Sequence, residues 1–307
     1  MSEQTEAQSG VLAGVSDELA NAVERAGQST VAVRARRHVA AGGVLWAPGV
    51  VVTADHVVEN DEDIKIVLPS GEEVRATLAG RDGGTDLAVL RIDNTTATPA
   101  QIADSTALRV GQLALAVARP GGEGLAASIG IISAIGGSWR TWRGGTIDAL
   151  VRTDLTLYPG FSGGPLVDVQ GRVAGINTSG LSRGHSLIIP TQTIKRVAEA
   201  LLARGRVSRG YLGVGLQPVQ LPADLAQKLG LQQPTGVILV TVDAGGPAAT
   251  AGLMLGDIIV ALEGKATADT DDVQAHLGTD SVGKALSATL IRGGELKTLP
   301  ITVRERQ

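Results

Sequence analysis

Three widely separated residues have the side chains that acyl transfer through a serine nucleophile requires. Ser162 lies in the run GFSGGPL at residues 160–166, where glycines on both sides permit a tight backbone. Such a backbone can direct the N–H groups of Gly160 and Ser162 toward the negative oxygen that develops when a carbonyl is attacked. A glycine-rich turn between two strands would have a similar sequence. The run therefore predicts a nucleophile and an oxyanion hole only in combination with a base.

A base and an orienting acid occur earlier in the chain. His56 follows the apolar run VVTA at residues 51–54, and neutral imidazole accepts a proton readily near pH 7. Asp86 precedes the apolar run LAVLRI at residues 87–92, and a buried aspartate there would hold the imidazole in one tautomer and stabilise its cation. Each residue alone is more often a turn or core residue. Together they predict that Ser162 attacks the carbonyl, His56 takes and returns the proton, and Asp86 orients His56.

Two other histidines are candidates for the base. His38 follows two arginines, which is typical of a solvated loop. His185 lies in a loop rich in glycine and serine, and no aspartate is placed relative to it as Asp86 is to His56. We therefore prefer His56 as the base.

The composition indicates a globular protein with two domains. The 307 residues are 43% hydrophobic, with 27 basic and 31 acidic side chains, so the charge does not favour nucleic acid or an anionic membrane as a partner. The lack of cysteine excludes disulfides, thiol nucleophiles and thiolate metal sites.

A helical pattern at residues 191–204 ends at Gly205, which we take as the domain boundary. Before it, short β-rich runs favour a barrel or sandwich; they lie at residues 30–33, 49–53, 64–68, 87–92, 113–117, 129–135, 166–169 and 173–176.

The order His, Asp, Ser is that of chymotrypsin-type double barrels. Around these residues the chain resembles the HtrA (high-temperature-requirement) family of serine proteases, in the phrases TADHVV, TDLAVLRI, RTDLTLYPGFSGGPLVD and GRVAGINT. The resemblance implies a mostly β protein, with a chymotrypsin-like double β-barrel protease domain at residues 29–205 and a smaller α+β PDZ domain at residues 206–307. Residues 1–28 form an N-terminal segment, in which we predict a short helix beginning near Ser16.

The residues before the nucleophile bear on specificity. Thr156 stands where an acidic residue in trypsin-like relatives selects basic side chains, so we do not expect cleavage after Lys or Arg. The resemblance places Leu157, His185 and Leu187 in the pocket walls, and we expect a preference for Val, Ala or Leu. Phe161 replaces the asparagine that is common in the family, which puts an apolar ring beside the nucleophile.

Two further runs, GYLGVGL at residues 210–216 and GPAATAGLMLGDII at residues 246–259, resemble a PDZ domain. Such a domain binds a peptide as an added strand and holds its terminal carboxylate on backbone N–H groups. The residues expected in the carboxylate loop are Tyr211, Leu212, Gly213 and Val214. The side chains expected to line the pocket for the last peptide residue are Leu212, Val214, Val273 and Leu277. They could instead belong to the core, and for Leu212 and Val214 we favour binding.

The run GGSWRTWRGG at residues 136–145 contains two of the three tryptophans. It is either a flexible hairpin tip or, by resemblance to the family, a loop that relays activation signals to the active site. Exposed Trp and Arg are common contact residues at interfaces. The second interpretation predicts that replacing both tryptophans with Ala weakens activation or assembly and spares the fold.

The resemblance implies an ATP-independent endopeptidase that cleaves unfolded or damaged polypeptides in protein quality control. It would need no metal and no organic cofactor, and it would assemble into a homo-oligomer, for example a trimer. Its PDZ domain would bind hydrophobic C-terminal peptides and regulate the protease. The alternative is a binding module, a holdase or scaffold with a catalytically silent barrel. Digestion of casein by the wild type, compared with Ser162→Ala, would separate the two.

The N-terminal residues do not resemble a signal peptide, because no basic segment precedes their short apolar patch. No apolar run approaches the roughly 20 residues that a membrane-spanning helix needs. Two locations stay open. The first is the cytoplasm, for the chain as written. The second is the periplasm or an organelle, if a targeting segment has been removed.

Overall fold

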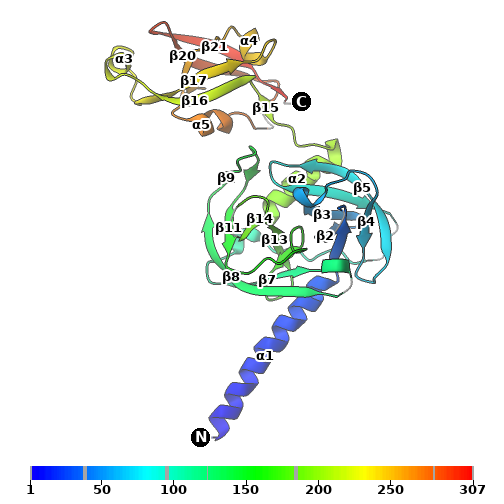
Figure 1. Ribbon diagram of the computed structural model, residues 1–307. Helices are drawn as coiled ribbons and strands as arrows, with labels where there is room; N and C mark the ends of the chain where they lie inside the picture. The colour runs from blue at the N-terminus through cyan, green and yellow to red at the C-terminus, as the bar shows by residue number, and fades with distance from the viewer. Residues whose placement is uncertain are drawn as a thin grey trace. The chain divides into compact units, whose positions relative to one another are not determined.

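The computed structural model describes residues 2–36, 40–93, 97–122, 124–182, 186–278 and 281–305, with side chains from Gly10 onward. The chain forms two compact units, Met1–Val207 and Ser208–Gln307 (Figure 1). We had placed the boundary at Gly205, which is the residue that ends the last helix of the first unit.

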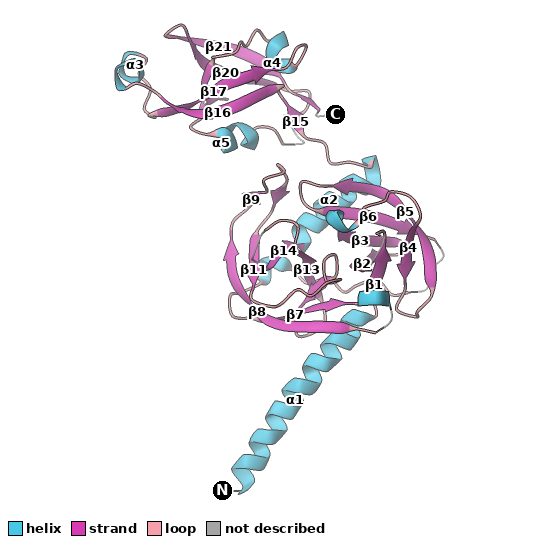
Figure 2. Ribbon diagram, in the orientation of Figure 1, coloured by secondary structure: helices cyan, strands magenta, loops and turns pink. Residues whose placement is uncertain are grey.

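The first unit contains two closed β-barrels of six strands each (Figure 2). Neighbouring strands of the first barrel are antiparallel, and its interior is filled by Val, Ile, Leu and Ala. β-Branched side chains such as Val and Ile suit a pleated, buried surface, which explains why these runs form strands. In hydrogen-bonded order the strands are β1 (Thr30–Arg34), β2 (Ala41–Ala47), β3 (Val50–Ala54), β6 (Leu87–Ile92), β5 (Glu73–Asp82) and β4 (Ile64–Val67).

The second barrel is also antiparallel, and together the two barrels confirm the mostly β double-barrel fold. Its strands, in hydrogen-bonded order, are β11 (Leu150–Thr153), β14 (Ser186–Pro190), β13 (Val173–Thr178), β12 (Pro165–Val167), β7 (Leu113–Ala118) and β8 (Ala126–Gly136). The remaining short elements of this unit are β9 (Trp139–Arg140), β10 (Thr146–Ile147) and the single-turn helices η1 (Asp55–Val57), η2 (Ser105–Ala107) and η3 (Pro120–Gly122).

Helix α2 (Thr191–Arg204) packs against both barrels, touching β5 and β6 of the first and β13 and β14 of the second. Its buried face, which includes Ile194, Val197 and Leu201, joins a core cluster with residues of both barrels. The helix ends at Gly205, whose left-handed conformation allows its N–H to bond to the carbonyl of Leu201. The helix therefore fixes the two barrels relative to each other, and with them the residues at their junction.

Helix α1 (Ser2–Gly27) is longer than the short helix that we predicted near Ser16. Ala22 and Ala26 in its last turns are buried against the barrels, whereas Val11 and Leu12 are exposed. Glu, Gln and Ala have high helix propensity, and the helix extends beyond the part that packs. None of the described helices is both long and apolar enough to cross a membrane.

The second unit has the α+β architecture that we predicted for the PDZ domain. Its core gathers apolar side chains from the sheet, such as Leu239, Ile259 and Leu290, against Val273 of a helix. The main sheet runs β16 (Val214–Gln220), β17 (Thr235–Val242), β18 (Ile258–Leu262), β20 (Ala285–Arg292) and β21 (Glu295–Thr302). The other elements are β15 (Gly210–Tyr211), which pairs with β22 (Arg304–Glu305), β19 (Lys265–Ala266) beside β18, and the helices α3 (Ala223–Lys228), α4 (Pro247–Thr250) and α5 (Thr270–Ala275).

Candidate active site

His56 and Asp86 are brought together by the pairing of two strands of the first barrel. In the antiparallel pair β3 and β6, Ala54 lies opposite Leu87. The residues after β3 and the residue before β6 therefore meet at the same end of the pair. His56 lies in η1, directly after β3, and Asp86 directly precedes β6. Strand register thus determines that the two side chains meet.

The carboxylate of Asp86 accepts hydrogen bonds from the ring and the backbone of His56. The Nδ1 atom of His56 lies 2.9 Å from Oδ2 and 3.0 Å from Oδ1, and the backbone N–H donates to Oδ1 at 3.0 Å. Asp86 is only 1% exposed. A buried carboxylate bonded to Nδ1 keeps the proton on that nitrogen, which leaves Nε2 of His56 as the proton acceptor.

A third donor to Asp86 comes from the second barrel. Thr178, the last residue of β13, donates a hydrogen bond from its hydroxyl to Oδ2 of Asp86. The same hydroxyl accepts a hydrogen bond from the backbone N–H of Gly180 at 2.9 Å. A Cβ atom on Gly180 would lie 2.7 Å from Oδ2 of Asp86 and 2.8 Å from Nδ1 of His56. The chain after β13 therefore passes directly over the His56–Asp86 pair.

Ser162 lies in the loop before β12, and its carbonyl accepts a hydrogen bond from Gly42 of the first barrel at 2.9 Å. Its hydroxyl oxygen lies 3.1 Å from that of Ser179, and the Ser179 oxygen lies 3.5 Å from Nε2 of His56. Among the described residues, Ser179 is the hydrogen-bond partner of the Ser162 hydroxyl. The structure thus brings the three predicted residues to one place, with Ser179 next to both Ser162 and His56.

The loop that contains Ser162 is held by a buried asparagine. The side-chain amide of Asn177 donates to the carbonyls of Gly164 and Pro165 at 3.0 and 2.8 Å, and its backbone carbonyl accepts from Gly163. Gly163 has a φ of +85°, and a Cβ atom there would lie 2.2 Å from the carbonyl oxygen of Gly42. Glycine is therefore required at this position, both for its conformation and for its close contact with β2.

The predicted oxyanion donors have no acceptor among the described residues. Gly160 has a φ of +92°, a conformation that glycine adopts readily. Within the described residues, neither its N–H nor that of Ser162 donates to another group, whereas the N–H of Phe161 between them bonds to the carbonyl of Tyr158. Unpaired N–H groups beside a serine hydroxyl fit donors that await the oxygen of a substrate.

The ring of Phe161, which adjoins the nucleophile in sequence, is buried in the core of the second barrel. Its ring meets that of Tyr158 edge to face, with centroids 5.7 Å apart. The residues predicted for the specificity pocket differ in exposure: Thr156 is exposed, Leu157 half-buried and Leu187 buried. The other two histidines that we considered, His38 and His185, lie outside the described residues.

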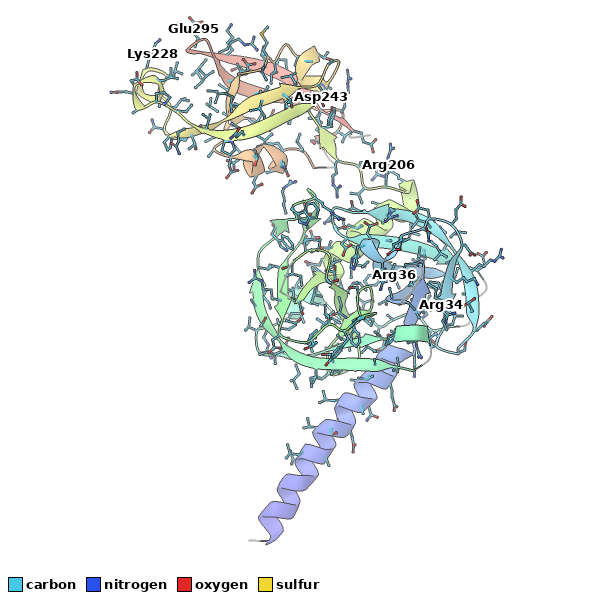
Figure 3. All side chains as sticks on the ribbon, in the orientation of Figure 1. Arg34, Arg36, Arg206, Lys228, Asp243 and Glu295 are labelled. Carbon is cyan, nitrogen blue, oxygen red and sulfur yellow. The ribbon has the colours of Figure 1, made fainter. Side chains whose placement is uncertain are left out.

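In the second unit, the predicted carboxylate loop connects β15 to β16. Gly213 has a φ of +72°, and its carbonyl accepts a hydrogen bond from the N–H of Asp243 at 2.8 Å. The carboxylate of Asp243, labelled in Figure 3, accepts a hydrogen bond from the phenol of Tyr211. Asp243, which directly follows β17, therefore holds both Tyr211 and Gly213 of this loop.

The side chains predicted for the peptide pocket fall into two groups. Leu212 is 2% exposed and belongs to the core of the unit together with Val273. Val214 and Leu277 are half-buried and pack against that core. Burial of Leu212 favours the core role that we had weighed against binding, and the half-buried pair is better placed to meet a ligand. The peptide-binding role of all four stays a prediction.

Sequence reasoning missed four neighbours of the triad, namely Asn177, Thr178, Ser179 and Gly180. They follow one another directly in the run NTSG, of which Asn177 and Thr178 end the phrase GRVAGINT that we had used for the resemblance, and Ser179 and Gly180 come directly after it. The resemblance thus led directly to this segment, but the role of each residue depends on contacts made across the two barrels. Among the described residues, no group of three or more His, Asp or Glu side chains is placed to hold a metal ion.

The fold and the site define a chymotrypsin-like serine peptidase domain followed by a PDZ domain. Family models agree with this division: a trypsin-like peptidase domain matches residues 41–176, and a PDZ domain matches residues 210–303.

Solved structures of similar sequence cover almost the whole chain. The HtrA-type protease AlgW with a decapeptide is 30% identical, covers 94% of this chain and 99% of its own, and has a TM-score of 0.77. The serine endoprotease from Yersinia pestis is 30% identical, with 94% and 98% covered and a TM-score of 0.76. The chain therefore belongs to the HtrA-type proteases, as its sequence phrases had indicated.

A curated relative from Halomonas elongata, named a probable periplasmic serine endoprotease DegP-like, is 36% identical over 273 residues. The match covers 87% of this chain but only 56% of that relative. A DegP-like relative from Pseudomonas putida shows the same proportions, with 35% identity and 56% of its length covered. The chain thus spans little more than half the length of these relatives.

Proposed function

We propose that the chain is an ATP-independent serine endopeptidase in which Ser162, His56 and Asp86 form the catalytic triad. The observation that supports this most directly is the Asp86 carboxylate, buried and 2.9 Å from Nδ1 of His56, with Ser179, the hydrogen-bond partner of Ser162, 3.5 Å from Nε2. This is the arrangement in which a histidine can act as general base for a serine.

In the proposed reaction, Oγ of Ser162 attacks the carbonyl carbon of a peptide bond while Nε2 of His56 takes its proton. The N–H groups of Gly160 and Ser162 stabilise the oxyanion. His56 then gives the proton to the leaving amine, and water hydrolyses the acyl-enzyme by the same route. Asp86 keeps the imidazole oriented and stabilises its cation throughout. These steps need no metal and no organic cofactor.

The nucleophile is tested by labelling with a fluorophosphonate and by digestion of casein. We expect Ser162→Ala to abolish labelling and to lower the rate of casein cleavage by roughly four orders of magnitude or more. Ser133→Ala, at an exposed position on β8, is the matched control and should behave as the wild type. Mass spectrometry of the labelled peptide identifies the reacting residue. Labelling on another residue, or casein cleavage that survives in Ser162→Ala, would refute the assignment.

We further propose that the pocket beside Ser162 prefers Val, Ala or Leu at the cleaved position. Leu157 and Leu187 would form its walls, and Thr156 supplies no negative charge to bind a basic side chain. A peptide library digested by the wild type should give products that end in small or medium aliphatic residues. A profile dominated by Arg or Lys would contradict this specificity.

The substrates that we propose are unfolded or damaged polypeptides. The PDZ domain would bind their hydrophobic C-termini, and this binding would regulate the protease. Support comes from the similar AlgW structures, which are described with a decapeptide and with a tripeptide. The loop Tyr211–Val214 would hold the terminal carboxylate, and Val214 and Leu277 would contact the last side chain. Fluorescence anisotropy with a labelled peptide ending in Val, with and without a C-terminal amide, tests this: amidation should remove binding.

The relatives named periplasmic favour the periplasm over the cytoplasm as the place where this chain works. We propose that location, and a homo-oligomer such as a trimer as the working form. Cell fractionation tests the first proposal and light scattering of the purified protein the second. A protein found only in the cytoplasmic fraction, or a strict monomer, would contradict them.

A further inference from the structure

Ser179 occupies an unusual position beside the proposed triad. Its hydroxyl oxygen lies 3.1 Å from that of Ser162 and 3.5 Å from Nε2 of His56. The first distance is at the long end for an O–H···O hydrogen bond, which usually spans about 2.5–3.0 Å, and the second is longer still. The hydroxyl of Ser162 therefore has a partner that competes with His56, and that partner lies on the side of the imidazole where the proton must go.

This geometry affects the step in which the nucleophile is activated. A serine hydroxyl has one proton, which it can donate to one acceptor at a time. Either hydroxyl can be the donor in the bond between Ser162 and Ser179. When Ser162 donates, its proton is not available to Nε2 of His56, which is the contact that general-base catalysis needs. The hydroxyl oxygen of Ser179 lies 3.5 Å from Nε2 of His56, which is too long for efficient transfer of the proton from Ser179 to His56. Ser179 is thus placed to restrain the nucleophile, not to relay its proton.

The position of Ser179 is set by its two neighbours. Thr178 is bonded to the buried carboxylate of Asp86, and Gly180 lies so close to the His56–Asp86 pair that a Cβ atom would clash. The backbone of Ser179 is therefore tied to the triad on both sides. Its side chain, in contrast, is exposed, so an arriving substrate can reach it.

We propose that the Ser179 hydroxyl accepts the proton of Ser162 and so holds it in an unreactive hydrogen bond, and that a bound peptide breaks this bond as Ser162 turns toward His56. Ser179 is then a positioning residue that slows acylation without touching the reacting carbonyl. The inference rests on the proposed function, because it takes Ser162 as the nucleophile and His56 as the base.

The test compares the rate of fluorophosphonate labelling in the full chain with those of Ser179→Ala and Ser179→Thr. We expect Ser179→Ala to label roughly two- to tenfold faster than the wild type, the range that one hydrogen bond changes. Ser179→Thr keeps a hydroxyl and should label at the wild-type rate. With a peptide substrate under single-turnover conditions, the acylation rate constant should rise in Ser179→Ala while the KM stays unchanged.

The outcomes separate this inference from the proposed function. If Ser179→Ala labels at the wild-type rate or more slowly, the restraint is refuted, and a slower rate would mean that Ser179 assists the reaction. If Ser162→Ala is labelled like the wild type, the proposed function fails instead. Circular dichroism melts of all variants show whether they are folded, and Ser133→Ala controls for the loss of an exposed serine elsewhere in the same barrel.

Discussion

The hydroxyl of Thr178 donates a hydrogen bond to the carboxylate of Asp86 across the junction of the two barrels. Because Asp86 is buried, this donor cannot be replaced easily by water, and hydrogen bonds to charged groups stabilise by about 1.5–3 kcal/mol. We expect Thr178→Val to lower kcat/KM by roughly tenfold or more. Thr178→Ser restores the hydroxyl and should restore activity. If Thr178→Val cleaves peptides as fast as the wild type, the bond does not support catalysis.

Gly180 is expected to tolerate no side chain. A Cβ atom there would lie 2.7 Å from Oδ2 of Asp86 and 2.8 Å from Nδ1 of His56, so Gly180→Ala must displace one of them. Displacement of a catalytic group by about 1 Å can cost roughly a hundredfold in rate. The measurement is kcat on a peptide substrate. Gly137→Ala, where nothing lies within 4 Å of the added atom, is the control, and an equally small effect of both variants would contradict the prediction.

The double barrel and the meeting of His56, Asp86 and Ser162 could be predicted because their side-chain types are chemically specific and their order matches a known arrangement. Ser179 and Gly180 could not. Serine and glycine are common in turns, and their roles arise from contacts with residues far away in the chain, such as His56. The sequence contains no local sign of which turn glycine meets a catalytic group.

Strand β2 shows a second reason why prediction was incomplete. Its sequence, AGGVLWA, contains two glycines, which weaken the strand pattern. The structure explains one of them: a Cβ atom on Gly42 would lie 2.4 Å from the backbone nitrogen of Gly164 in the nucleophile loop. The close contact that positions Ser162 requires glycine at residue 42. That glycine weakens the pattern of apolar side chains from which a strand is predicted. Helix α1 was underestimated for a different reason, since we looked for a cap near Ser16 and the helix continues past it.

The two tryptophans of the 136–145 loop have different surroundings, so they should behave differently on mutation. Trp142 is 75% exposed, with the guanidinium of Arg143 over its ring at 4.6 Å. Trp139 is partly buried and packs against the core. We therefore revise the expectation that both can be replaced without cost. Trp142→Ala should leave the free energy of unfolding unchanged, whereas Trp139→Ala should lower that of the first unit by about 2 kcal/mol. Denaturant unfolding followed by circular dichroism measures both, and equal effects would contradict the difference.

The same loop contacts the segment that leads to Asp86. The hydroxyl of Thr141, which is buried, donates to the carbonyl of Gly84 at 2.6 Å and accepts from the N–H of Gly145 at 3.1 Å. Thr141→Val keeps the shape but removes both bonds. We expect it to lower kcat by several-fold, because Gly84 lies two residues before Asp86 and its displacement moves the carboxylate. Thr141→Ser should act as the wild type. Unchanged kcat in Thr141→Val would mean that the contact is structural only.

The pH dependence of the second unit should reflect Asp257. Burial alone would raise the pKa of its carboxyl, but hydrogen bonds from Arg292 and from the N–H of Met254 lower the pKa below its usual value. A carboxyl whose pKa is lower in the folded state stabilises that state above the unfolded pKa, about 3.9. This contribution is lost as pH falls from about 4 through the folded pKa.

Calorimetry should therefore show the second unit melting at a lower temperature in that pH window. The melting temperature of Asp257→Asn should be lower than that of the wild type at pH 7 and should depend less on pH. Glu295→Gln, at an exposed carboxyl labelled in Figure 3, should neither melt earlier at pH 7 nor change the pH dependence. An identical pH profile for Asp257→Asn and the wild type would refute the assignment.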